Sequence, residues 1–169
     1  MSADAIDRYK RPGEHLYDVA TPGIKANFPD LLAALGRSQL ARFPQSQQQR
    51  RKLVSHYRSR LGELDVRVVP READDGSADH LMVIDAGSRR RRDAIITELT
   101  ARQIGSSVHF RPLQTFTWYV DKEDLVGPSG VETASRLDGQ ILSLPLHLHL
   151  DEVAVERVCD AVGDALAEV

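Results

Sequence analysis

Hydrophobic and polar positions change their pattern near Asn27. Residues 1–22 show no sustained periodicity, and their Pro-Gly pairs predict an arm or loop. Apolar side chains then recur at steps of three and four residues, which predicts a helix that Asn27 caps. Pro44 either ends this helix or begins the next, so the pattern predicts a helical hairpin over 29–62. The two apolar stripes consist of Leu31, Leu32, Leu35, Leu40 and Phe43, and of Leu53, Val54, Tyr57 and Leu61.

The remainder of the chain alternates short apolar runs with helical stripes. Apolar runs that end at proline or at polar turns predict strands, and stripes at three- and four-residue spacing predict helices. A long loop with an aromatic cluster is expected over 114–130. This region therefore predicts a small sheet covered by helices. The strands are expected at 66–69, 81–84, 107–110 and 141–144, and the helices at 91–102 and 151–166.

Composition narrows the class of protein without specifying a reaction. The chain has 169 residues, of which 41% are hydrophobic and 28% charged, so it predicts a folded domain rather than a disordered tail. Its single Cys excludes a disulfide framework and a multi-cysteine zinc module. A net charge of −3 argues against a general nucleic-acid-binding protein, because such proteins need a basic surface.

The sequence also leads to expectations about the cellular compartment and the division into domains. No apolar run approaches about 18 residues, so no membrane span is predicted. Residues 1–10 lack the apolar centre of a secretory signal. We therefore expect a cytoplasmic protein with an N-terminal arm and loop (1–28), a helical hairpin (29–62) and a small domain (63–169).

Three groupings of reactive side chains have ordinary structural explanations. His147 and His149 could share a metal ion with His109, but no known zinc motif accompanies them, so surface histidines are favoured and no metal site is predicted. Cys159 falls on the apolar stripe of the last helix, which favours a buried, inert thiol. The run Arg89–Arg92 could bind phosphate, although a solvated charged turn is favoured.

Two further places suit an anion or a sugar. His109 and Arg111 end a short strand and lead into the aromatic loop over 114–130. Flat aromatic side chains of this loop could form the sides of a ligand pocket. An ordinary strand end is the alternative. The segment 23–27 leads a Gly loop into a helix N-terminus, whose free N–H groups suit a phosphate. Plain capping by Asn27 is the alternative there.

The order of these segments resembles the DegT/StrS family of nucleotide-sugar aminotransferases from about residue 5 to the end of the chain. The branch that aminates 4-keto sugars on UDP or dTDP is the most similar. The series of segments, rather than any single motif, makes the resemblance specific. Its residues are Tyr17 to Val19, Pro22 to Phe28, Asp30, Ala33-Ala34, Gln39-Leu40, Arg51, Tyr57 to Leu61, His80-Leu81, Arg92-Asp93, Ile104-Gly105, His109 to Leu113 and Leu142 to Leu146.

The resemblance implies a fold, a cofactor and a set of contacts. The fold is an α/β (α+β) small domain, as in the C-terminal part of fold-type I aminotransferases that use pyridoxal phosphate (PLP), with a helical hairpin before a mostly antiparallel sheet. Asn27 matches the family's contact with the PLP phosphate of the neighbouring subunit, and Lys25 in the same loop is expected to help. His109 and Arg111 match the segment near the pocket for the UDP- or dTDP-sugar.

The chain departs from the family at the residue that anchors PLP. That lysine lies in a Ser-Phe-His-x-x-Lys-type segment of the large domain, before the region that this chain matches. None of the four lysines lies in such a segment, so no catalytic residue is assigned. The lysines are Lys10, Lys25, Lys52 and Lys122, and lesser departures that affect substrate contacts are Ala26, Asp79 and Gln114.

Three functions are compatible with this sequence. The leading hypothesis is the C-terminal half of a split sugar aminotransferase that works only with a separately encoded N-terminal half. The alternative is a non-catalytic remnant or a binding and oligomerisation module, in which leucines of the hairpin left exposed drive self-association. A third is a stand-alone enzyme that uses Lys25 as its Schiff-base residue.

Overall fold

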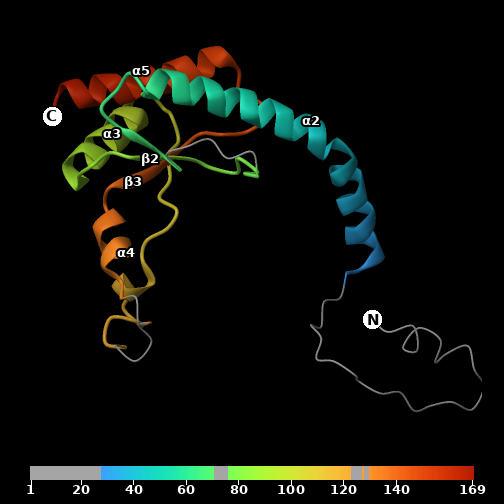
Figure 1. Ribbon diagram of the computed structural model, residues 1–169, viewed down its shortest axis with the longest axis horizontal. Coiled ribbons are helices and arrows are strands. Elements are labelled where there is room, and N and C mark those ends of the chain that lie inside the picture. Colours follow the sequence, from blue (N-terminus) through green and yellow to red (C-terminus); the bar gives the residue numbers. More distant parts are fainter. Residues whose placement is uncertain (1–27, 71–75, 123–126, 128–129) are drawn as a thin grey trace, which may run out of the picture. The chain divides into compact units, whose positions relative to one another are not determined.

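The computed structural model describes residues 28–70, 76–122, 127 and 130–169. The chain divides into two compact units, residues 1–39 and residues 40–169. Figure 1 shows the described elements in chain order. They are α2 (Asp30–Leu61), β1 (Arg67–Val69), β2 (Met82–Asp85), α3 (Arg89–Ala101), the 3-10 turn η1 (Leu113–Thr115), α4 (Glu132–Leu137), β3 (Ile141–Leu144) and α5 (Glu152–Ala167).

Helix α2 replaces the predicted hairpin. It is continuous from Asp30 to Leu61, with Pro44 inside it, so the expectation of two helices over 29–62 is wrong. A proline removes one backbone donor and crowds the preceding turn, but its fixed φ is itself helical. The residues around Pro44 are mostly Leu, Ala, Arg and Gln, which are good helix formers, and they allow the helix to continue through it.

The three strands form one antiparallel sheet in the order β1-β2-β3. Because paired residues in antiparallel strands point to the same face, the register assigns each side chain to one of two faces. Ile84 pairs with Val68 on one side and with Leu142 on the other, and these three apolar residues share the face that joins the core. The predicted small antiparallel sheet covered by helices is therefore confirmed.

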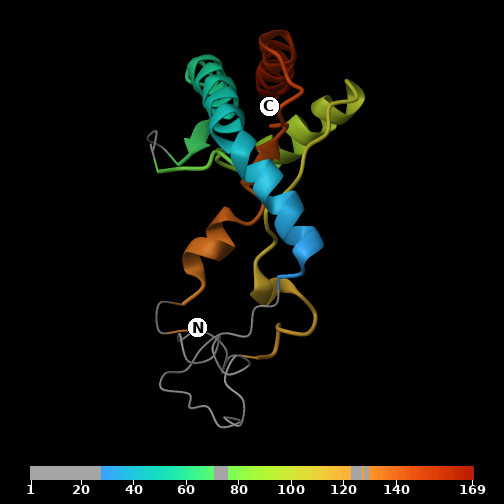
Figure 2. The same cartoon turned by 90° about the vertical axis from the view of Figure 1, so that its right-hand side faces the viewer.

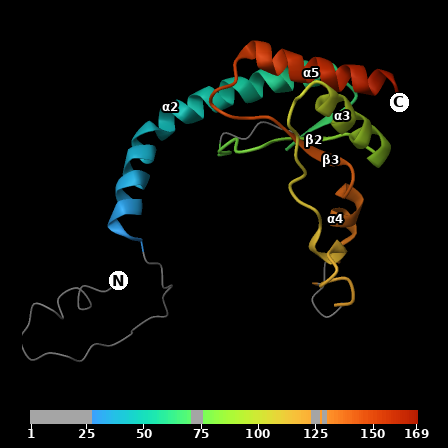
Figure 3. The same cartoon turned by 180° about the vertical axis from the view of Figure 1, so that it is seen from behind.

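The helical layer covers this apolar face. In Figures 1 and 3, α5 runs beside the C-terminal half of α2, with α3 next to them. Tyr57 of α2 is fully buried, and its hydroxyl donates a 2.9 Å hydrogen bond to the carbonyl of Pro145 just after β3. Glu156 of α5 accepts hydrogen bonds from His56 and Arg60 of α2, both at 2.6 Å. The two helices are thus joined by both packing and charge.

The opposite face of the sheet is more polar. Asp85 and Ser143 lie on it, and both are almost completely buried. Figure 2 shows α4 and the η1 loop extending away from the helical layer. This side of the sheet therefore supports the segments that the sequence analysis connected with ligand binding.

Two local expectations differ from the structure. The strand predicted over 107–110 is reduced to a single bridge between Ser107 and Ser143. Pro112, which has no backbone donor, follows closely and limits further pairing. Helix α4 falls in the region expected to follow the long loop; no side chain caps its N-terminus in the structure, and Glu132 in its first turn is the start signal that the sequence analysis did not use.

Candidate functional site

The segment predicted to contact substrate lies beside β3. Backbone hydrogen bonds of 3.1 and 2.7 Å join Ser107 to Ser143. His109 follows and is half-buried, with its Nδ1 atom 2.8 Å from the hydroxyl oxygen of Ser143. The imidazole is held through Nδ1 by a buried serine, so its Nε2 atom is the one available to a ligand.

Arg111 is held by its own turn rather than by the sheet. Its Nε donates a 2.7 Å hydrogen bond to the hydroxyl of Thr115, and a second guanidinium nitrogen donates to the Thr115 carbonyl. The guanidinium also lies over the ring of Phe116, at 5.0 Å from the ring centroid. These contacts keep Arg111 exposed at the surface. The described contacts do not bring it together with His109.

Aromatic side chains are presented on the loop after η1. Trp118 is 65% exposed and packs edge-to-face against Tyr119, with ring centroids 4.8 Å apart. The ammonium of Lys122 lies 4.8 Å from the centroid of the Trp118 ring, which is a cation–π distance. The loop therefore offers flat apolar surfaces to a partner or ligand.

The predicted cofactor contacts Lys25 and Asn27 lie outside the described residues. The lysines that the structure describes do not fit the anchor of PLP. Lys52 is exposed on α2, and Lys122 stacks on Trp118 in the surface loop. Neither side chain is buried, so neither is enclosed in a pocket that could hold the cofactor.

The remaining reactive side chains behave as ordinary structural residues. His147 and His149 have ring centroids 6.2 Å apart, and in the described part of the chain no three His, Cys, Asp or Glu side chains are grouped to bind a metal. Cys159 is buried among apolar residues of the core. Burial is the main cause that raises the pKa of its thiol to about 12, so the thiol stays protonated at neutral pH.

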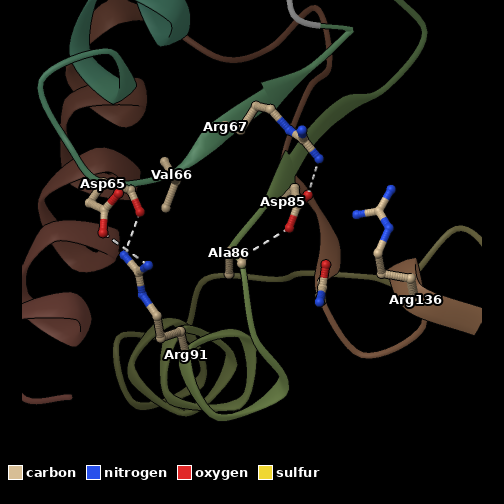
Figure 4. Close-up of a pocket in the computed structure, with 9 residues that line it drawn as sticks. Asp65, Val66, Arg67, Asp85, Ala86, Arg91 and Arg136 are labelled. Atoms are coloured by element: carbon tan, nitrogen blue, oxygen red, sulfur yellow. Dashed lines mark hydrogen bonds and ion pairs between the residues drawn. The ribbon is translucent and has the colours of Figure 1, made fainter. Parts of the chain in front are cut away.

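A pocket that the sequence analysis did not predict lies at the end of β2 (Figure 4). It has a volume of about 430 Å³. Arg67 pairs with Asp85, whose other oxygen accepts a 2.8 Å hydrogen bond from the backbone N–H of Gly87. Gly87 has φ +79°, which favours glycine at this turn. The lining residues are Asp65, Val66, Arg67, Asp85, Ala86, Gly87, Arg91, Arg136 and Gln140.

The run Arg89–Arg92 was the one sequence signal for this pocket. The structure divides the run: Arg91 enters the pocket, Arg89 pairs with Asp138, and Arg92 pairs with Asp93. Most of the run therefore behaves as the expected charged turn. Arg67 and Arg136 come from other elements, and only the antiparallel register and the position of α4 bring them to Arg91.

None of the described helices has the length and apolar character needed to cross a bilayer.

Comparison with known proteins identifies relatives along nearly the whole chain. A sequence profile of the DegT/DnrJ/EryC1/StrS aminotransferase family matches residues 2–163. The chain is 33% identical to the spore coat polysaccharide biosynthesis protein SpsC of Bacillus subtilis. It is 30% identical to the UDP-4-amino-4-deoxy-L-arabinose–oxoglutarate aminotransferase of Shewanella sediminis. Each match covers 97% of this chain but only 43% and 44% of the two relatives.

Solved structures of aminotransferases also match nearly the whole of this chain but only part of their own length. A sugar aminotransferase from Streptococcus pneumoniae superposes with a TM-score of 0.74 at 28% identity. The match covers 93% of this chain and 40% of that protein. The same Streptococcus pneumoniae protein has also been solved in PLP and PMP forms. The chain thus spans less than half the length of the relatives it matches.

Proposed function

Because the chain belongs to the DegT/DnrJ/EryC1/StrS aminotransferase family, we propose that it supplies the C-terminal part of a PLP-dependent enzyme that aminates a nucleotide-linked keto sugar. The reaction serves the biosynthesis of polysaccharides or deoxyamino sugars, and we expect it to take place in the cytoplasm. The observation that carries the proposal is the family match over residues 2–163 combined with coverage of only about 43% of a relative.

A second polypeptide part completes the enzyme in this proposal. The 169 residues contain no Ser-Phe-His-x-x-Lys-type segment, and the described lysines do not fit a cofactor anchor. The lysine that holds PLP therefore belongs to an N-terminal half outside these residues. We assign to this chain the supporting contacts: Lys25 and Asn27 toward the cofactor phosphate, and His109 and Arg111 toward the UDP- or dTDP-sugar.

The local geometry supports the substrate assignment of His109 and Arg111. His109 is oriented by a buried serine, so its outer nitrogen is presented in a fixed direction. Arg111 is exposed, and its stacking on Phe116 leaves the charged group accessible to a diphosphate. A sugar nucleotide has both hydroxyl groups and a diphosphate, which match these two side chains.

Exposed apolar side chains on α2 support the need for a partner. Leu31 is 82% exposed and Leu40 is 70% exposed, although both belong to the apolar stripe predicted to be packed. Large apolar side chains that one helix leaves exposed indicate an interaction site. In the proposed enzyme the lysine-bearing half covers it.

The test is co-expression of this chain with the lysine-bearing half from the same organism. We expect a complex that co-purifies and acquires the visible absorbance of lysine-bound PLP. Borohydride reduction and peptide mapping should then place the cofactor on the other half. Cofactor trapped on Lys25 of the isolated chain would instead identify a stand-alone enzyme. Absence of both a complex and bound cofactor would refute the proposal.

A binding or oligomerisation module without catalysis is the second candidate. The exposed stripe on α2 favours it, because a second copy of the chain could cover the same surface. The two candidates differ in their response to the lysine-bearing half. If the chain is part of the enzyme, contacts with the lysine-bearing half replace the contacts between its own copies. If it is a binding module, it remains a homo-oligomer when that half is present.

A further inference from the structure

The pocket in Figure 4 contains more positive than negative charge. Three guanidinium groups line it, from Arg67, Arg91 and Arg136, against the carboxylates of Asp65 and Asp85. Each carboxylate is already committed to one arginine, since Asp85 pairs with Arg67 and Asp65 pairs with Arg91. Among the described residues no carboxylate pairs with Arg136, so its charge is uncompensated.

The two carboxylates differ in how firmly they are fixed. Asp85 is 5% exposed and receives hydrogen bonds from both Arg67 and the Gly87 backbone, so it acts as a fixed support that orients Arg67. The side chain of Asp65 is 94% exposed, and its oxygen lies 3.0 Å from the Arg91 guanidinium. An exposed ion pair of this kind contributes little to stability, but Arg91 also donates a hydrogen bond to the Asp65 backbone carbonyl and is therefore held at this edge of the pocket.

Two of the three arginines, Arg67 and Arg136, face a common space. In Figure 4 the guanidinium groups of Arg67 and Arg136 point toward the same space beside Asp85, whereas the guanidinium of Arg91 points toward Asp65 at the other edge of the pocket. The volume of about 430 Å³ falls within the range of roughly 300–1,000 Å³ found for small-molecule sites. Arginine is suited to planar, bidentate binding of oxyanions.

We propose that this pocket binds a phosphate group, with Arg136 and Arg67 as its donors. The phosphate comes either from free inorganic phosphate or from the diphosphate of a nucleotide. The site is separate from His109 and Arg111, which do not line the pocket. It therefore does not depend on the proposed aminotransferase function.

The experiment is calorimetric titration of the full 169-residue chain with inorganic phosphate and, separately, with UDP, at constant ionic strength. We expect saturable binding with a dissociation constant at or below about 1 mM for at least one probe. Preference for UDP that Arg136→Gln removes identifies the nucleotide as the source, because UDP bound at His109 and Arg111 would not respond to this variant. Equal binding of the two probes identifies the free anion. Arg136→Gln should weaken binding about tenfold or more, because a charge-assisted hydrogen bond is lost.

The matched control is Arg90→Gln, which removes the same charge from an exposed neighbour that does not line the pocket. It should leave the affinity within about twofold, since only long-range screening changes. Asp65→Asn should tighten binding because it removes a negative charge from the pocket lining. Circular dichroism verifies that each variant is folded. Equal weakening by Arg136→Gln and Arg90→Gln, unchanged affinity in Asp65→Asn, or no saturable binding of either probe would overturn the proposal.

Discussion

The exposed stripe of α2 leads to a direct test of association. Leu31 and Leu35 are four residues apart, so they lie on the same side of the helix, and they are 82% and 54% exposed. We predict that the isolated chain self-associates through this surface. Replacing both leucines by serine should make it monomeric without unfolding the core, because neither residue belongs to the buried cluster.

The magnitude follows from the exposed fractions. Full burial of a leucine contributes about 1.5–3 kcal/mol, so covering the exposed part of both side chains contributes roughly 2–4 kcal/mol. In a symmetric dimer each copy presents the same surface, and the loss doubles to about 4–8 kcal/mol. A change of 1.4 kcal/mol is tenfold in an equilibrium constant, so the dissociation constant should rise by about three orders of magnitude or more.

Sedimentation velocity over a series of protein concentrations measures this change. The control is Val153→Ser, which removes an apolar side chain that is 76% exposed on a different helix, α5. The control should associate like the original chain. A chain that stays monomeric at every concentration, or a double serine variant that associates as before, would show that the stripe is not an interface.

Three further predictions concern the core and its charged edge. Tyr57→Phe keeps the buried ring but leaves the carbonyl of Pro145 without its 2.9 Å hydrogen bond, so urea unfolding should show a loss of about 1 kcal/mol, whereas no change would contradict the bond. Cys159 should resist a thiol reagent at pH 8 in the folded chain and react at once in denaturant, because burial raises its pKa to about 12; fast reaction in the folded state would refute this. Hydrogen bonding from Arg60, and then from His56, lowers the pKa of Glu156, so its contribution to stability is present above the ordinary glutamate pKa and is lost as pH falls through the lowered value. Glu156→Gln should therefore flatten the acid limb of stability measured by thermal unfolding, and an unaltered limb would exclude this pair as its cause.

The pattern of apolar and polar residues predicted those helices and strands well whose apolar side chains are buried in the core. The strands at 82–85 and 141–144 and the last helix follow directly from apolar runs and stripes, because each buries that same face in the core. The prediction of a helical hairpin over 29–62 was wrong for a different reason. A proline is compatible with either a helix break or a continuous helix, and the turns on both sides of Pro44 decide between them.

The sites were only partly accessible from sequence. His109 was identified by its position at a strand end, but its partner Ser143 lies 34 residues away and depends on the sheet register. The arginine pocket depends even more on tertiary structure, because Arg67 and Arg136 are far apart in the chain and only Arg91 belonged to a visible run. Neither charge density nor spacing indicates which arginine of such a run turns inward.

Helix α2 has one half packed in the core, where Tyr57 and Leu61 are fully buried, while its other half presents bare leucines. The anchored turns provide the costly nucleus of the helix, so the remaining turns need only propagate from it. A protein that docks on those leucines binds a helix that is already formed. Its binding free energy therefore does not have to include the ordering of this segment from coil to helix. This lowers the entropic barrier to assembly and makes rapid, reversible pairing compatible with a modest contact area.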